Sequence, residues 1–135
     1  MRSYVLSGDT AHYDKVIKDF EALNVKIIPA FAGGLDGRPA IEKYLIGKDG
    51  PLIDVLVSLT GFSLVGGPAY NDTNAAVETL SNLNVPYISA HPLEFQTLPQ
   101  WEVSSTGLGP IDTTMLVALP ELDGAIVPTV YAGRR

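Results

Sequence analysis

Short runs rich in apolar and β-branched residues alternate along this chain with segments of helical periodicity. The predicted strands are residues 3–7, 25–32, 53–59, 85–90 and 125–131. The predicted helices are residues 11–23, 40–47, 71–84 and 109–119. Strands separated by helices form βαβ units, so the first four strands are expected to be parallel neighbours in one sheet.

The predicted fold class is therefore α/β, with a three-layer, mainly parallel sheet of the flavodoxin-like or Rossmann-like kind. The phrases "LNVKIIPA" and "LNVPYISA" both stand at predicted helix-to-strand junctions and match at six of eight positions. This similarity indicates either a duplication or the general likeness of such junctions. In sheets of this kind, ligands bind at the carboxyl ends of the strands.

A glycine-rich loop, "SLTGFSLVGGPAYND" (residues 58–72), follows the third predicted strand at that edge. It has no lysine and matches neither phosphate-binding motif, G-x-G-x-x-G or G-x-x-x-x-G-K-[ST]. Its glycine and apolar side chains suit a large, flat, mostly apolar ligand, because glycine lets backbone approach the face of such a ligand. The same loop would also suit a surface buried against another domain.

Composition limits the remaining classes of function. The length of 135 residues fits one domain, and the absence of cysteine excludes disulfides, thiolate metal sites and cysteine nucleophiles. The net charge is −6 and the basic residues are scattered, so we expect no nucleic-acid partner. No apolar run approaches the roughly 20 residues needed to cross a bilayer, so we expect no membrane span. The chain starts almost at once on a predicted strand and stops straight after one, and we expect a single domain, residues 1–135, of a much longer protein.

Four polar residues near predicted strand ends are candidates for chemistry. His91 and Glu94 lie three residues apart in "HPLEF", where an imidazole and a carboxylate are able to bind a divalent ion or move a proton. Glu121 and Asp123 lie in "PELDG", which is also plain turn chemistry. The residues with weaker claims, each of which also fits an ordinary structural role, are Asp9, His12, Asp36 and Trp101.

Four longer phrases resemble a known family. "FAGGLDGRPAIEKY", "SLTGFSLVGGPAYND", "NVPYISAHPLEFQT" and "ALPELDGAIVPTVYAGR" are similar to the large porphyrin-binding subunit of magnesium chelatase, a family that includes the cobaltochelatase large subunit. The resemblance runs from Ser3 to Arg135 and is closer to the bacteriochlorophyll type than to the plant form. The family's subunit is about ten times longer, so the chain resembles one internal domain of it.

The resemblance implies an activity and a set of partners. It implies ATP-dependent insertion of Mg²⁺, as a substrate, into protoporphyrin IX on the way to (bacterio)chlorophyll. Two AAA+-type subunits would bind the ATP, and the remaining domains of the large subunit would complete the site. The implied location is the bacterial cytoplasm, either free or peripheral to photosynthetic membranes.

The resemblance also assigns roles to individual residues. The porphyrin face would lie on the glycine-rich loop, and its propionates would meet backbone N–H groups and an arginine. The residues expected to bind substrate are Phe62, Leu64, Gly66, Gly67, Tyr70 and Arg38. The residues expected to act in catalysis are Glu94, Glu121 and His91, and those expected to meet the metal are Glu94, Glu121 and Asp123.

Two other functions remain open at this point. The domain is either architectural, with its apolar edge packed on neighbouring domains, or a stand-alone flavodoxin-like module that binds a small molecule. The resemblance favours a direct role in porphyrin metalation, in which the isolated domain is expected to be inactive.

Overall fold

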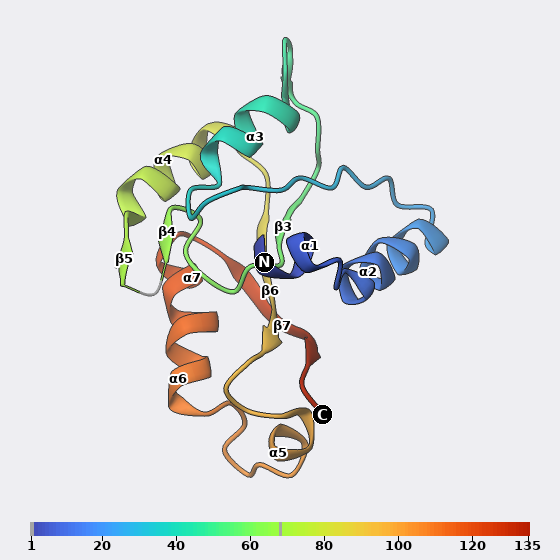
Figure 1. Ribbon diagram of the computed structural model, residues 1–135. Coiled ribbons are helices and arrows are strands. Elements are labelled where there is room, and N and C mark those ends of the chain that lie inside the picture. The colour runs from blue at the N-terminus through green and yellow to red at the C-terminus, as the bar shows by residue number, and fades with distance from the viewer. Residues whose placement is uncertain (1, 68) are drawn as a thin grey trace.

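A small parallel sheet lies at the centre of the molecule (Figure 1). The computed structural model describes residues 2–67 and 69–135. The sheet contains β3 (Leu56–Ser58), β6 (Tyr87–Leu93) and β7 (Ile126–Gly133), in the order β3-β6-β7. Both pairs are parallel, as the alternating sequence pattern predicts. The chain is thus a mixed α/β structure whose sheet has three strands.

Helical segments connect these strands. α4 (Thr73–Leu83) lies between β3 and β6 in the chain, with Asp72 as its N-cap and Asn84 as its left-handed C-cap. Between β6 and β7 the helical segments are α5 (Leu98–Glu102), α6 (Pro110–Asp112), the π-helix η1 (Thr113–Ala118) and α7 (Leu119–Leu122). The predicted helix 109–119 therefore exists, although it contains a π-helical turn and continues to residue 122.

Two of the five predicted strands are wrong. Residues 3–7 lie within a helix, α1 (Arg2–Ser7), and residues 25–32 form neither helix nor strand. These two strands were predicted from their Val, Ile and Tyr residues. Such residues favour strands because they pack well on a pleated, half-buried surface, and neighbouring strands must supply that surface. Because β3 pairs only with β6 among the described residues, no such surface reaches either segment. The two helices predicted near them are confirmed as α2 (Ala11–Ala22) and α3 (Arg38–Tyr44).

Two short antiparallel hairpins complete the described elements. One pairs β1 (Ile46–Gly47) with β2 (Gly50–Pro51). The other pairs β4 (Gly66–Gly67) with β5 (Tyr70–Asn71), inside the glycine-rich loop. The loop therefore has regular backbone pairing, which its sequence did not indicate.

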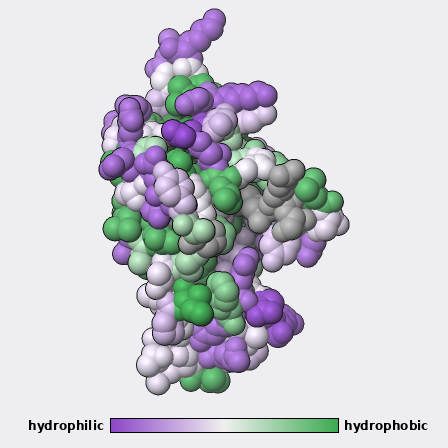
Figure 2. Space-filling view, turned by 60° about the vertical axis from the view of Figure 1, so that its left-hand side comes forward, coloured by the Kyte–Doolittle hydropathy of each residue, from purple (hydrophilic) through white to green (hydrophobic). Residues whose placement is uncertain are grey.

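The core lies where α3 and α4 cover β3 and β6. Its first cluster contains Ile41, Leu45 and Leu83, and its second contains Leu80, Tyr87 and Ala125. By contrast, α2 buries none of its residues and projects away from α4 (Figure 1). Apolar residues on the face drawn in Figure 2 are dispersed among polar ones rather than gathered in one band. None of the helices in residues 2–67 and 69–135 has the length and apolarity needed to cross a bilayer.

Candidate functional site

The glycine-rich loop is held in place by Asp123. Oδ2 of this carboxylate accepts hydrogen bonds from Ser63 Oγ and from the Leu64 backbone N–H, both at 2.7 Å. Asp123 is 2% exposed, so these bonds are shielded from water. The loop is thereby fixed to the turn between α7 and β7. Sequence reasoning missed this role, because Asp123 and its two partners are about sixty residues apart in the chain.

Gly66 and Gly67 serve the hairpin within this loop. Gly66 has a φ of 123°, and a Cβ there would lie 2.2 Å from the carbonyl oxygen of Tyr70. A Cβ at Gly67 would lie 2.9 Å from Leu35 Cδ1. The Gly66 N–H also donates to the Leu35 carbonyl at 2.7 Å, which ties the hairpin to the segment before α3. Glycine is thus required at position 66, where a Cβ would meet backbone, whereas at Gly67 it would meet the end of an exposed side chain.

The apolar side chains of the loop differ in how far they are available to a ligand. Leu64 packs against both core clusters, while the Phe62 side chain is half-buried. Tyr70 is 70% exposed. Of the three residues predicted to meet a porphyrin face, Phe62 and Tyr70 therefore offer ring surface to a partner.

Arg38 is paired with Asp36. Its Nη2 donates to Asp36 Oδ2 at 2.7 Å, and its Nε donates to Oδ1 at 3.0 Å. Hydrogen bonding to Arg38 lowers the pKa of Asp36 below its usual range, and the pKa of Arg38 is raised in turn. Both side chains are about two-fifths exposed, so the guanidinium keeps one accessible side for an incoming carboxylate.

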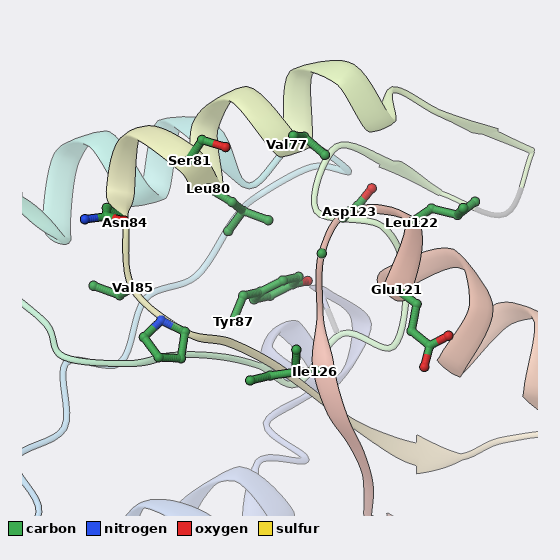
Figure 3. Close-up of a pocket in the computed structure, with 12 residues that line it drawn as sticks. Val77, Leu80, Ser81, Asn84, Val85, Tyr87, Glu121, Leu122, Asp123 and Ile126 are labelled. Atoms are coloured by element: carbon green, nitrogen blue, oxygen red, sulfur yellow. The ribbon is translucent and has the colours of Figure 1, made fainter.

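Two of the hollows on the described surface differ in size and in position. The larger, of about 500 Å³, opens where α4 and α7 meet the amino ends of β6 and β7 (Figure 3). Its lining includes Val77, Leu80, Tyr87, Glu121, Asp123 and Ile126. The smaller, of about 400 Å³, is lined by residues 31–36 together with Pro39, Ala40, Lys43 and Tyr44. The smaller hollow lies beside the segment that precedes α3, whereas the larger one opens at the opposite edge of the sheet from the one that the sequence favoured.

Tyr87 forms the floor of the larger hollow, which we call the groove over Tyr87, and Glu121 lies at its rim. Burial raises the pKa of Tyr87 to about 12, so its phenol remains protonated at neutral pH. The Glu121 side chain is exposed, and Figure 3 shows its carboxylate turned away from the Tyr87 ring. The groove therefore combines an apolar floor with one carboxylate at its edge.

His91 lies within β6 and is only 1% exposed. Neither of its ring nitrogens has a hydrogen-bond partner in the part of the chain that the structure describes. Asp112, at the end of α6, is equally buried, and its Oδ1 is also unpartnered. Burial lowers the pKa of His91, and the negative charge of Asp112 acts in the opposite direction. Asp112 was not among the candidates from the sequence, since nothing local to "GPID" indicates that it lies near His91.

Glu94 is exposed one residue beyond the end of β6, near an aromatic cluster. The His12 ring lies 3.9 Å from the centroid of Tyr13 and 6.4 Å from that of Tyr131. Burial raises the pKa of both tyrosines, and the charge of Glu94 contributes in the same direction. His12, which the sequence marked only as a weak candidate, thus belongs to a packed aromatic group.

The carboxylates expected to meet a metal ion lie at opposite ends of the sheet. Glu121 and Asp123 line the groove over Tyr87, where β6 begins, whereas Glu94 follows Leu93, where β6 ends. Six steps along a strand of this kind span roughly 20 Å. Two oxygen ligands of one Mg²⁺ lie within about 4 Å of each other, because each is about 2 Å from the ion. Within the described part of the chain, no group of three or more His, Asp or Glu side chains is placed to hold a metal ion.

Comparison with known proteins shows to which family this chain is related. The sequence model of the CobN/Magnesium Chelatase family matches residues 1–135. The H-type magnesium-chelatase subunit of Cereibacter sphaeroides is 67% identical over 134 residues, which are 99% of this chain and 11% of that protein. The chloroplastic subunit ChlH of Oryza sativa subsp. indica is 50% identical over 137 residues, covering 98% of the chain and 10% of the relative.

A cobalt enzyme is similar at a lower level. The aerobic cobaltochelatase subunit CobN of a Sinorhizobium species is 30% identical over 128 residues, which are 93% of this chain and 10% of that protein. The chain therefore spans about a tenth of the length of these curated relatives. The Cereibacter protein is more similar than the rice form, in agreement with the resemblance seen in the sequence. With the family model matching from the first residue to the last, the chain belongs to the CobN/magnesium chelatase family.

Proposed function

We propose that this chain is a domain of a magnesium chelatase large subunit that takes part in inserting Mg²⁺ into protoporphyrin IX. The observation that carries the proposal is the 67% identity to the H-type chelatase subunit of a bacterium across 99% of the chain. Mg²⁺ is a substrate in this reaction. ATP would be bound by two AAA+-type partner subunits, and the other domains of the large subunit would complete the porphyrin site. The location would be the bacterial cytoplasm, free or at the surface of photosynthetic membranes.

For the porphyrin, we propose contact with the outer side of the glycine-rich loop. The exposed ring of Tyr70 and the half-buried ring of Phe62 supply flat apolar surface there. Arg38 is held next to this loop by Asp36, and an exposed guanidinium suits a propionate. Leu64, Gly66 and Gly67, which belong to the same proposed set, would act through the backbone shape that they give the loop.

For the chemistry, we propose that His91, Glu94 and Glu121 assist the departure of pyrrole protons and the arrival of the metal. Glu94 and Glu121 are exposed carboxylates, which keeps them accessible to a hydrated cation. Asp123, the third proposed metal ligand, has one oxygen committed to Ser63 and Leu64 and one oxygen without a partner. Mg²⁺ loses water reluctantly, so a carboxylate that enters its hydration shell would ease its transfer. Because Glu94 and Glu121 lie at opposite ends of β6, only one of them would contact the ion.

A porphyrin titration of this chain tests the proposal. A soluble deuteroporphyrin is added to the wild type, to Tyr70→Ala and to Phe62→Ala, while the Soret band and the fluorescence of Trp101 are recorded. We expect saturable binding that weakens at least about tenfold in both variants. The matched control is Phe20→Ala, which removes an exposed phenylalanine from α2, and it should bind as the wild type does. Absence of binding, or equal weakening in the control, would contradict the loop assignment.

An architectural role is the second candidate, and one observation favours it. The loop residues Ser63, Leu64, Gly66 and Gly67 all make contacts within the domain. In that case the loop surface packs on another domain of the parent subunit. A porphyrin affinity of the full-length subunit that is unchanged by Tyr70→Ala and Phe62→Ala would establish this alternative.

For the fold, we propose that the three strands are part of a larger flavodoxin-like sheet in the complete subunit. The support is that consecutive long strands pair in parallel through helical connections. A structure of the whole subunit tests this directly. Additional parallel strands beside β3 or β7 are expected, and the proposal would be refuted if β3 and β7 were still the two edge strands of the sheet in the complete subunit.

A further inference from the structure

One face of β6 carries a row of polar side chains where a buried strand ordinarily carries apolar ones. Tyr87, Ser89 and His91 occupy alternate positions, so their side chains share a face of the sheet. Their exposed fractions are 3%, 2% and 1%. Ser89 Oγ and both ring nitrogens of His91 have no hydrogen-bond partner among residues 2–67 and 69–135. A buried polar group without a hydrogen-bond partner costs free energy. Several such groups in one place therefore indicate that a small hydrogen-bonding molecule binds among them.

Asp112 brings a charge to this row. It is 1% exposed, and its Oδ1 has no hydrogen-bond partner among the described residues. The π-helix η1, which begins directly after Asp112, packs against β6, the strand that carries His91. The two side chains form no direct hydrogen bond with each other. A water molecule between them would accept from or donate to both, and would satisfy an oxygen and a nitrogen together.

The glycine-rich loop and the π-helix close over His91. Gly61 has a φ of 71°, and a Cβ there would lie 3.3 Å from His91 Cβ and 2.6 Å from Leu116 Cδ2. The missing side chain thus lets the loop backbone descend onto the strand beside η1. π-Helical turns occur frequently at functional sites, and this one begins directly after Asp112.

We propose that His91 and Asp112 form a water-bridged, proton-accepting pair beneath the glycine-rich loop. This inference rests on the proposed function, in which two pyrrole protons must leave the porphyrin. A pyrrole N–H bond breaks, its electron pair stays on the nitrogen, and the proton passes through bound water to a ring nitrogen of His91. Asp112 stabilises the resulting imidazolium. The electron pair left on the pyrrole nitrogen then bonds to Mg²⁺. After the proton returns to solvent, the pair is ready for the second one.

Two opposing influences act on the pKa of His91. Burial favours the neutral ring by lowering the pKa of His91, so the ring is ready to accept a proton near neutral pH. Asp112 is the one charged group whose effect on His91 is resolved, and it moderates the loss of basicity. Asp112 is therefore a positioning residue that acts through His91, and its removal should alter the pH dependence of the reaction.

The first test measures the pair itself. The chain has two histidines, so His91 can be titrated by NMR in the wild type and in Asp112→Asn, with His12→Gln identifying the resonances. We expect a lower pKa for His91 in Asp112→Asn, because a stabilising negative charge is lost. An unchanged pKa overturns the pair. This readout does not depend on porphyrin, so it separates failure of the pair from failure of the proposed function.

The second test measures turnover by the full-length subunit with its partners, ATP and Mg²⁺. In Asp112→Asn, we expect the acidic limb of the rate profile to move to lower pH and the plateau to fall about 10²-fold, with porphyrin affinity unchanged. Ser89→Ala keeps both His91 and Asp112 and removes one water-binding hydroxyl, and a reduced plateau is expected there as well. An unaltered profile in both variants, or equal losses of affinity and turnover, overturns the proton-accepting role.

Discussion

At the scale of single residues, Asp123 carries more of the domain's organisation than its position in a turn suggests. Its carboxylate joins the turn after α7 to the glycine-rich loop through two bonds that are shielded from water. Hydrogen bonds to a charged acceptor contribute about 1.5–3 kcal/mol, and unpaired donors add to the loss. The stability of the loop therefore depends on a single side chain outside it.

We expect Asp123→Ala to lower the free energy of unfolding by about 3 kcal/mol, because it leaves the Leu64 N–H without its acceptor and Ser63 Oγ with only the 3.3 Å bond to the Val65 carbonyl. Urea denaturation followed by the fluorescence of Trp101 measures the change. The control is Asp54→Ala, which removes an exposed carboxylate and should change stability by less than about 0.5 kcal/mol. A similar loss in the two variants would show that Asp123 does not anchor the loop.

A second prediction at the scale of single residues concerns the pair of Asp36 and Arg38, whose contribution to stability depends on pH. Because Arg38 lowers the pKa of folded Asp36, the pair stabilises the fold above the unfolded carboxyl's value of about 3.9. That contribution is lost as the pH falls through the lower, folded pKa. In Arg38→Gln, NMR titration should find the pKa of Asp36 raised towards its ordinary value. An Asp36 pKa that is the same in Arg38→Gln and the wild type would refute the pairing.

At the scale of elements, the β4–β5 hairpin sets the shape of the glycine-rich loop. Gly66→Ala should lower the free energy of unfolding by at least about 2 kcal/mol, because its Cβ would collide with backbone at a positive φ. Gly34→Ala is the matched control, since a Cβ there meets nothing within 4 Å. Thermal unfolding of both variants measures the difference. Equal melting temperatures would mean that the hairpin does not form in solution.

The elements also show what could be predicted from the sequence. The four predicted helices were found because helical periodicity is a local signal, whereas α1 was predicted as a strand and α5 was not predicted as a helix. The two "LNV" junctions show the limit of local reasoning. Asn24 and Asn84 both adopt a left-handed conformation, with φ of 61° and 51°, yet a strand follows closely only after Asn84. β6 has a partner on each side, whereas residues 25–32 pair with no strand among the described residues.

The candidate site was predictable only in part, for the same physical reason. The sequence singled out His91, Glu121 and Asp123 as residue types with chemistry beside strand ends. It did not indicate that Asp112 lies near His91 or that Asp123 binds the loop, since these relationships depend on contacts between distant segments. Sequence spacing gives the composition of a site, while tertiary packing decides which of its members meet.

At the scale of the whole molecule, the two proposed catalytic carboxylates lie too far apart to act on one metal ion together. Glu94 follows the end of β6, and Glu121 lies beside its beginning, roughly 20 Å away. In the full-length subunit, we therefore expect only one of the variants Glu94→Ala and Glu121→Ala to lose about 10²–10⁴-fold in turnover. Its porphyrin affinity should change little, because apolar contact supplies about 25 cal/mol per Å² of buried area.

Chelation rates at saturating porphyrin, together with separately measured porphyrin affinities, distinguish the outcomes. Loss of turnover in Glu94→Ala alone would place the metal at the carboxyl end of the sheet, near His12 and Tyr131. Loss in Glu121→Ala alone would place it at the groove over Tyr87. Equal and large losses in both would contradict the expectation, because one ion cannot contact two carboxylates at opposite ends of β6. Wild-type rates in both variants would remove metal chemistry from this domain and leave it an architectural part of the subunit.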